Sequence, residues 1–108
     1  MRVGDRVFVA GTAAVMPGGG DPPPDAYGQA RRCLEIIAAA LAEAGGSLED
    51  VVRTRAYLTD PSHFDGFAKA HGEAFSAIRP ANTTVVAQLL DPRWHVEIEA
   101  EAVLRAPE

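Results

Sequence analysis

Hydrophobic and polar residues follow two different periods along this chain, and the change of period separates predicted strands from predicted helices. Residues 6–15 are rich in β-branched and aromatic side chains and predict a strand. Gly11 interrupts this strand, where a missing side chain permits a β-bulge or the close approach of a ligand. Residues 51–58 alternate with period two and predict a second strand. Its two predicted faces are Val52, Thr54, Ala56 and Leu58, and Arg53, Arg55 and Tyr57.

The last quarter of the chain predicts two further strands. Residues 83–90 and 93–104 form them, joined by a short Asp91-Pro92 turn. The final strand alternates cleanly, so that one face is apolar and the other carries carboxylates. Its polar positions are His95, Glu97, Glu99 and Glu101.

Two segments carry apolar residues at helical spacing. The first spans residues 26–44, with Asp25 placed to cap its N-terminus. The second runs to about residue 77, and Ser62 with Asp65 at its start resembles a capping box. Each apolar stripe needs a surface to cover, so both helices are expected to pack on a sheet.

The order of elements predicts one domain, residues 1–108, in which both helices cover one face of a single sheet. The opposite face then carries a mixture of charged and aromatic side chains with apolar residues such as Val51 and Val103. Exposure to solvent explains such a face, and so does a polar interface between subunits.

Composition narrows the classes of function. The net charge is -5 without any basic run, which disfavours nucleic-acid binding. Hydrophobic residues make up 47% of the chain, but no apolar run approaches the roughly 20 residues of a membrane span. A single cysteine, Cys33, excludes an internal disulfide and suits a reducing compartment, and no targeting peptide is visible, so the cytoplasm is expected. We interpret Cys33 as a packed apolar residue rather than a nucleophile, because no histidine or aspartate lies near it in sequence.

Several segments, in the same order along the chain, resemble the RidA family, also called YjgF. The Pro-Ala-Asn-Thr-Thr and Val-Glu-Ile-Glu-Ala motifs of the last two strands carry most of the resemblance. The matching segments are residues 3–12, 30–37, 47–60 and 79–100, and the resemblance extends over essentially the whole chain. The resemblance implies an α+β, chorismate-mutase-like fold with one mixed sheet. It also implies a homotrimer in which the open sheet faces meet and small-molecule pockets lie between subunits.

The activity implied by the resemblance is hydrolysis of reactive enamines or imines to a keto acid and ammonia, without a metal or cofactor. Glu97 aligns with the family's water-handling glutamate, and Thr84 with a position where a side chain contacts substrate. Gly11 and Thr12 align with the main-chain edge of the pocket. Each residue also has a purely structural interpretation: an acidic stripe or ion pair for Glu97, a strand-favouring residue for Thr84 and a simple bulge for Gly11 and Thr12.

Asn82 departs from the family pattern. It stands where family deaminases carry an arginine that holds a substrate carboxylate through two charged hydrogen bonds. An asparagine supplies no charge, so 2-imino acids are expected to bind weakly and the substrate to differ from them. A turn or strand-entry role after Pro80 explains Asn82 equally well.

Two arginines on one strand face suggest a replacement for the missing charge. We hypothesise that Arg53 or Arg55 reaches the pocket between subunits and binds a carboxylate there. The favoured alternative is that both neutralise the glutamates of the neighbouring strand. The histidines show no metal-ligand spacing, so a metal site is not expected, and His71 is interpreted as a packed residue.

The leading hypothesis is therefore an imine or enamine deaminase with Glu97 activating water and Asn82 and Thr84 orienting substrate. The alternative is a catalytically inactive trimer that binds a small metabolite. Ribonuclease activity is the least favoured option, because the chain is acidic and lacks a histidine pair for phosphodiester chemistry.

Overall fold

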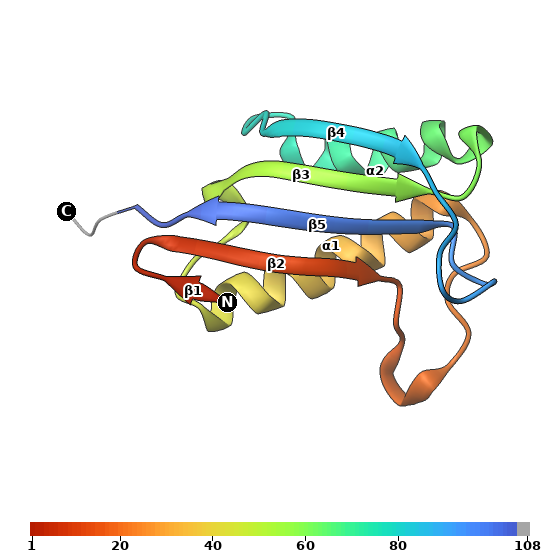
Figure 1. Cartoon of the computed structure of the whole chain (residues 1–108), viewed down its shortest axis with the longest axis horizontal. Coiled ribbons are helices and arrows are strands. Elements are labelled where there is room, and N and C mark those ends of the chain that lie inside the picture. Colours follow the sequence, from red (N-terminus) through yellow and green to blue (C-terminus); the bar gives the residue numbers. More distant parts are fainter. Residues whose placement is uncertain (106–108) are drawn as a thin grey trace.

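The computed structural model describes residues 1–105 and contains one mixed five-stranded sheet with two helices on one face, an α+β architecture (Figure 1). The strands lie in the spatial order β1-β2-β5-β3-β4. β3 and β4 are parallel, and the other neighbours are antiparallel. Their bounds are β1 (Arg2–Val3), β2 (Arg6–Ala13), β3 (Val51–Leu58), β4 (Ala81–Val86) and β5 (Val96–Val103).

The two helices, α1 (Ala26–Glu43) and α2 (Phe64–Phe75), begin after polar turns. Asp25 caps α1 as predicted, because its carboxylate accepts a hydrogen bond from the Gly28 amide at 2.9 Å. The predicted Ser62–Asp65 capping box is wrong. Asp60 instead accepts from the Ser62 amide at 2.8 Å, because a short 3₁₀ turn, Pro61–His63, precedes α2. Within residues 1–105, neither helix is long and apolar enough to cross a membrane.

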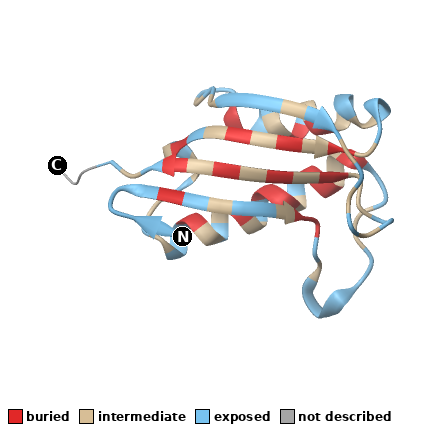
Figure 2. Ribbon diagram, viewed as in Figure 1, coloured by how far each residue is buried: buried red, intermediate tan, exposed pale blue. Residues whose placement is uncertain are grey.

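The core lies between the helix layer and the sheet face that it covers (Figure 2). α1 contributes fully buried side chains at helical spacing, among them Ile37 and Leu41, and α2 contributes Phe75. β5 contributes every second residue, so that its carboxylates are directed to the opposite face. The alternation predicted for residues 93–104 is confirmed within β5, where the buried set is Val96, Ile98, Ala100 and Ala102, but residues 93–95 belong to the preceding loop and not to the strand.

The predicted short turn between the last two strands is wrong. β4 ends at Val86 and β5 begins at Val96, so residues 87–95 form a loop. β3 lies between β4 and β5, and the chain must therefore pass across the end of β3 to reach β5. A tight Asp91-Pro92 turn could join only neighbouring antiparallel strands.

A register shift at the start of β3 reverses two predicted side-chain positions. Val51 pairs with Ala102 and Arg53 with Glu101, which leaves Val52 as an extra residue. Val51 is consequently 3% exposed and belongs to the core, whereas Val52 is 46% exposed. The predicted alternation resumes at Arg53 and is confirmed from there to Leu58.

Candidate functional site

Glu97 and Gly11 meet on the sheet face that the helices leave open. Glu97 lies between two buried residues of β5, so its side chain is directed away from the core. The pairing of β2 with β5 shifts between Val9 and Thr12, which is the bulge predicted at Gly11. A Cβ atom on Gly11 would lie 2.6 Å from Glu97 Oε2, so glycine is what allows the carboxylate to lie against the main chain there.

The bulge is held by a local hydrogen bond. Thr12 Oγ1 donates to the Ala10 carbonyl at 2.9 Å, and Thr12 pairs with Ile98, next to Glu97. Gly11 and Glu97 therefore lie together, whereas Thr12, next along the chain, pairs with a residue whose side chain is buried on the helix-covered face.

The neighbouring carboxylates of β5 have partners within the chain. Arg55 Nη1 lies 3.2 Å from Glu101 Oε1 and 3.7 Å from Glu99 Oε1. The Tyr57 hydroxyl donates to Glu99 at 2.5 Å, and this bond to a carboxylate raises the pKa of Tyr57. Arg55 thus neutralises two glutamates, as the favoured alternative supposed for it, whereas Arg53 forms no ion pair within residues 1–105.

Glu97 differs from these two glutamates. In the described part of the chain, residues 1–105, no side chain donates a hydrogen bond to its carboxylate or forms an ion pair with it. A carboxylate without a fixed partner, set against main chain on a partly exposed face, keeps its oxygens available to accept a proton from water.

The other predicted binding residues lie on the edge strand β4. Asn82 pairs with Thr54 of β3, and its amide nitrogen donates to Thr54 Oγ1 at 3.0 Å. The Thr84 hydroxyl donates to Asn82 Oδ1 at 2.8 Å. Since Thr54 is fully buried on the helix-covered face, Asn82 and Thr84 lie on that side of the sheet.

The hydrogen-bonded chain continues from β4 through the sheet to α2. Thr54 Oγ1 lies 2.8 Å from His71 Nε2, and the His71 ring packs between Phe67 and Phe75 at centroid distances of 5.3 and 4.7 Å. Burial lowers the pKa of His71, which favours the neutral ring. The link through Thr54 was not predicted from the sequence. Its signal was a hydroxyl residue in an otherwise apolar row, opposite a histidine on the apolar stripe of α2.

Within one chain the two groups of residues are not brought together. Gly11 and Glu97 meet on the open face, and Asn82 and Thr84 lie at the edge on the helix-covered face, with β3 between β4 and β5. A site that uses both groups must therefore take them from two copies of the chain.

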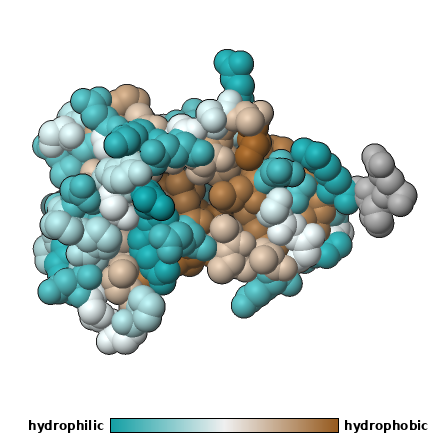
Figure 3. Space-filling view, turned by 180° about the vertical axis from the view of Figure 1, so that it is seen from behind, coloured by the Kyte–Doolittle hydropathy of each residue, from teal (hydrophilic) through white to brown (hydrophobic). Residues whose placement is uncertain are grey.

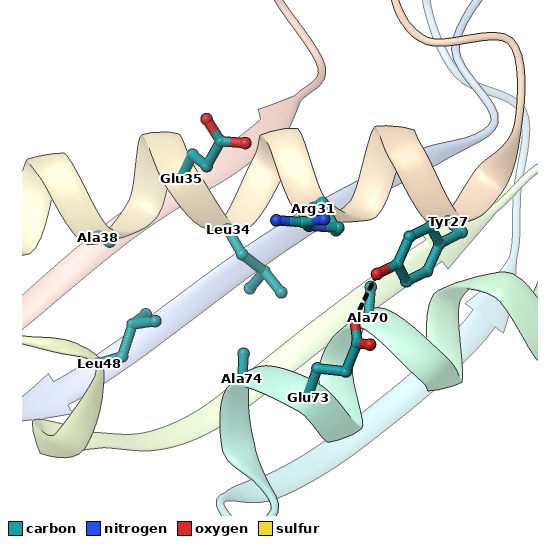
Figure 4. A pocket seen from close by; sticks show the side chains of 9 residues that line it. All are labelled: Tyr27, Arg31, Leu34, Glu35, Ala38, Leu48, Ala70, Glu73 and Ala74. Atoms are coloured by element: carbon teal, nitrogen blue, oxygen red, sulfur yellow. Dashed lines mark hydrogen bonds between the residues drawn. The ribbon is translucent and has the colours of Figure 1, made fainter.

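A separate hollow lies on the helix side, between α1 and α2 (Figure 3). This groove of about 490 Å³ has an apolar floor that includes Leu34 and Ala70. The Tyr27 hydroxyl donates to Glu73 Oε1 at 2.6 Å across it (Figure 4). None of the predicted site residues lines the groove.

The sulfur of Cys33 is not part of a reactive centre. Its side chain is fully buried, and burial, with the charge of Glu97 as a smaller cause, raises its pKa to about 12.

Comparison with known proteins identifies the family. The family model described as "Endoribonuclease L-PSP" matches residues 1–104. The chain belongs to the RidA/YjgF family. A relative from Escherichia coli K12, named "Putative reactive intermediate deaminase TdcF", is 32% identical over 96% of this chain and 83% of its own length.

Solved structures of the RidA/YjgF family share this fold. A member of the YjgF/YER057c/UK114 family from Mycobacterium tuberculosis has a TM-score of 0.86 and 40% identity, covering 95% of this chain and 82% of that one. The YjgF gene product of E. coli has a TM-score of 0.89 and 30% identity, covering 97% and 85%.

Proposed function

We propose that this RidA-family chain hydrolyses a reactive imine or enamine in a pocket formed between copies of itself, with Glu97 as the residue that takes a proton from water. The observation that carries the proposal is the Glu97 carboxylate against Gly11, which has no side-chain partner among residues 1–105, beside two glutamates that are already paired. The name of the TdcF relative as a deaminase supports the same reaction class.

The reaction needs one base and one proton carrier. Water adds to the C=N carbon while Glu97 accepts a proton from it, which forms a C–O bond and moves the C=N electron pair onto nitrogen. The nitrogen takes up a proton, the C–N bond breaks, and ammonia leaves as the carbonyl forms. One imine and one water thus give one carbonyl compound and one ammonia, and an enamine enters as its imine tautomer.

Assembly of copies supports the proposal because the open sheet face has the composition of an interface. Phe8, Val52 and Val103 are 42%, 46% and 39% exposed beside charged residues of the same face. A second copy, in the homotrimer that the family resemblance implies, would cover these side chains. It would also bring the Asn82 and Thr84 edge of one copy toward Glu97 of the next.

The proposal is tested by following the decay of imines generated in situ. An amino-acid oxidase supplies imines that carry a carboxylate, and an amine oxidase supplies imines without one. We expect wild-type protein to accelerate decay and Glu97→Gln to lose at least about a hundredfold of that acceleration. Glu101→Gln, a change of the same chemistry on the same face, is the matched control and should keep most of the activity.

Two results would contradict the deaminase. Glu97→Gln could retain full activity, which removes Glu97 from the chemistry. Alternatively, saturable ligand binding without any turnover would support the metabolite-binding trimer instead. Light scattering on both variants establishes that an activity loss is not a loss of assembly.

A further inference from the structure

The side-chain amide of Asn82 has a fixed direction. One of its two terminal atoms lies 3.0 Å from Thr54 Oγ1 and 3.5 Å from the Thr54 main-chain oxygen. A main-chain oxygen can only accept hydrogen bonds, so the amide nitrogen is the atom that faces it. The Asn82 oxygen is directed to Thr84, whose hydroxyl donates to it at 2.8 Å.

The buried end of this network keeps the amide in place. Thr54 Oγ1 accepts from Asn82, and Thr54 is fully buried, so its own proton needs an acceptor. Burial favours the neutral ring by lowering the pKa of His71, and in the neutral tautomer that carries its proton on Nδ1, His71 Nε2, 2.8 Å away, is that acceptor. The hydrogen bonds then run in one direction, from Thr84 to Asn82, from Asn82 to Thr54 and from Thr54 to His71.

This direction decides what the sheet edge offers to a ligand. The amide nitrogen of Asn82, which carries two N–H donors, is directed to the two oxygens of Thr54, and the hydroxyl proton of Thr84 is directed to Asn82 Oδ1. What remains free at the edge, where Asn82 is exposed, are lone pairs on Asn82 Oδ1 and Thr84 Oγ1. Two acceptor oxygens bind N–H donors and leave a carboxylate without a partner.

We infer that the Asn82–Thr84 edge binds a neutral group that presents N–H donors, such as a primary carboxamide, and discriminates against a carboxylate. The inference rests on the proposed function for the location of the ligand and deepens it by naming the substrate class, imines whose second polar group is an amide. His71 acts as a positioning residue, because it holds Asn82 through Thr54 and touches no ligand itself.

Pyruvamide and pyruvate test the inference, because they differ only in the group that would bind at the Asn82–Thr84 edge, a carboxamide in one and a carboxylate in the other. Calorimetric titration of the wild-type assembly is expected to show pyruvamide binding more tightly by about tenfold or more, since a carboxylate facing two acceptors loses hydrogen bonds to water without replacement. Asn82→Arg should reverse the preference. Equal or tighter binding of pyruvate by wild type overturns the inference, and so does binding of neither compound.

Variants of His71 separate positioning from mere packing. His71→Gln can still accept the Thr54 proton through its side-chain oxygen and should keep the amide preference. His71→Phe fits the aromatic surroundings but removes the acceptor, so the ratio of the two affinities should fall toward one. A loss of both affinities by the same factor, with the ratio unchanged, overturns the positioning role, and thermal unfolding of each variant checks the fold.

These measurements are independent of turnover. A wild-type protein that accelerates imine decay but prefers pyruvate retains the proposed function and refutes this inference. A protein that prefers pyruvamide but accelerates no imine decay refutes the proposed function and supports this inference.

Discussion

The reactivity of Cys33 is set by its burial in the core and not by its residue type. Its side chain is fully buried in α1, and its Sγ faces the Val96 carbonyl at 3.9 Å. A thiol reacts through its thiolate, and burial makes that form unfavourable. The same side chain on an exposed, electropositive helix end would be a candidate nucleophile. The presence of a cysteine in the sequence therefore does not by itself indicate a reactive site.

Cys33 is expected to resist a soluble disulfide reagent in the native protein. With its pKa raised to about 12 and no surface exposed, reaction at neutral pH requires opening of the fold. Addition of urea should therefore change the labelling from slow and unfolding-limited to rapid and complete. Immediate labelling of one equivalent of thiol in native buffer contradicts this.

His71 is a titratable ring in an aromatic environment, and this should make stability depend on pH. Its folded-state pKa is lowered by burial, whereas the unfolded value stays at about 6.5. Above that value the ring is neutral in both states and contributes nothing to the pH dependence. Below it the unfolded chain binds a proton that the folded chain does not, so stability falls with pH until the folded pKa is reached.

The measurement is urea unfolding of wild type and His71→Gln at about pH 7.5 and 5.5, on either side of the ordinary histidine pKa. Wild type should lose more unfolding free energy between the two values than the variant, which lacks the titrating ring. The rest of the chain is the same in both proteins, so the difference between them isolates His71. Parallel losses would exclude His71 as a source of the pH dependence.

At the scale of elements, Gln29 joins α1 to two loops. Its side chain is fully buried, and its nitrogen donates to the carbonyls of Pro23 and Arg93, each at 2.9 Å. Its oxygen accepts from the His95 amide at 2.7 Å. These bonds position the segments that lead into α1 and into β5, the strand that carries Glu97.

Replacing Gln29 by leucine is expected to destabilise the fold by about 2–4 kcal/mol, because three main-chain groups lose partners that water cannot easily replace. Gln88→Leu is the matched control, since Gln88 is exposed in the loop after β4 and should change stability by less than about 0.5 kcal/mol. Denaturant unfolding of both variants measures the difference. Equal, small effects would show that the loops do not depend on Gln29.

The elements themselves were largely predictable, because their signals are local. Asp25, a residue type that favours the N-cap, predicts the start of α1, and the structure confirms it. Gly11 predicts a bulge in β2, and the structure contains one there. The order of strands was not predictable, since pairing β5 with both β2 and β3 is decided by contacts between distant segments. The Val51–Val52 reversal has the same origin, because a bulge arises from the register with a partner strand.

For the candidate site, residue types were predictable and their arrangement was not. Glu97, Asn82 and Thr84 could be named from motifs, but periodicity did not show that Asn82 would bond to Thr54 on one face while Glu97 occupied the other. Hydrogen-bond direction depends on atoms from three elements, β3, β4 and α2, that lie far apart in the sequence.

At the scale of the whole molecule, the open sheet face is the surface that a second copy would cover. It combines exposed apolar side chains with paired charges, and a hollow of about 360 Å³ lies on it, lined by Phe8, Val52 and Arg53 among others. The two groups of candidate site residues occupy different faces of each copy. Assembly therefore has a chemical consequence, because it decides which residues share a pocket.

A complementation experiment follows from this division. Glu97→Gln removes the base, and Asn82→Trp fills the edge at an exposed position, so each protein alone should be inactive in imine hydrolysis. If each pocket takes Glu97 from one copy and Asn82 from another, refolding the two variants together gives mixed assemblies in which about a quarter of the pockets contain both intact residues. Activity should then return to about that fraction of wild type.

The control is the same two variants mixed after separate folding, where slow exchange of copies should leave the mixture inactive. If both residues of a pocket came from one copy, every pocket of a mixed assembly would carry one defect, and no activity would return under either protocol. The co-refolded sample thus distinguishes a pocket shared between copies from one that belongs to a single chain, because only a shared pocket lets one variant supply what the other lacks.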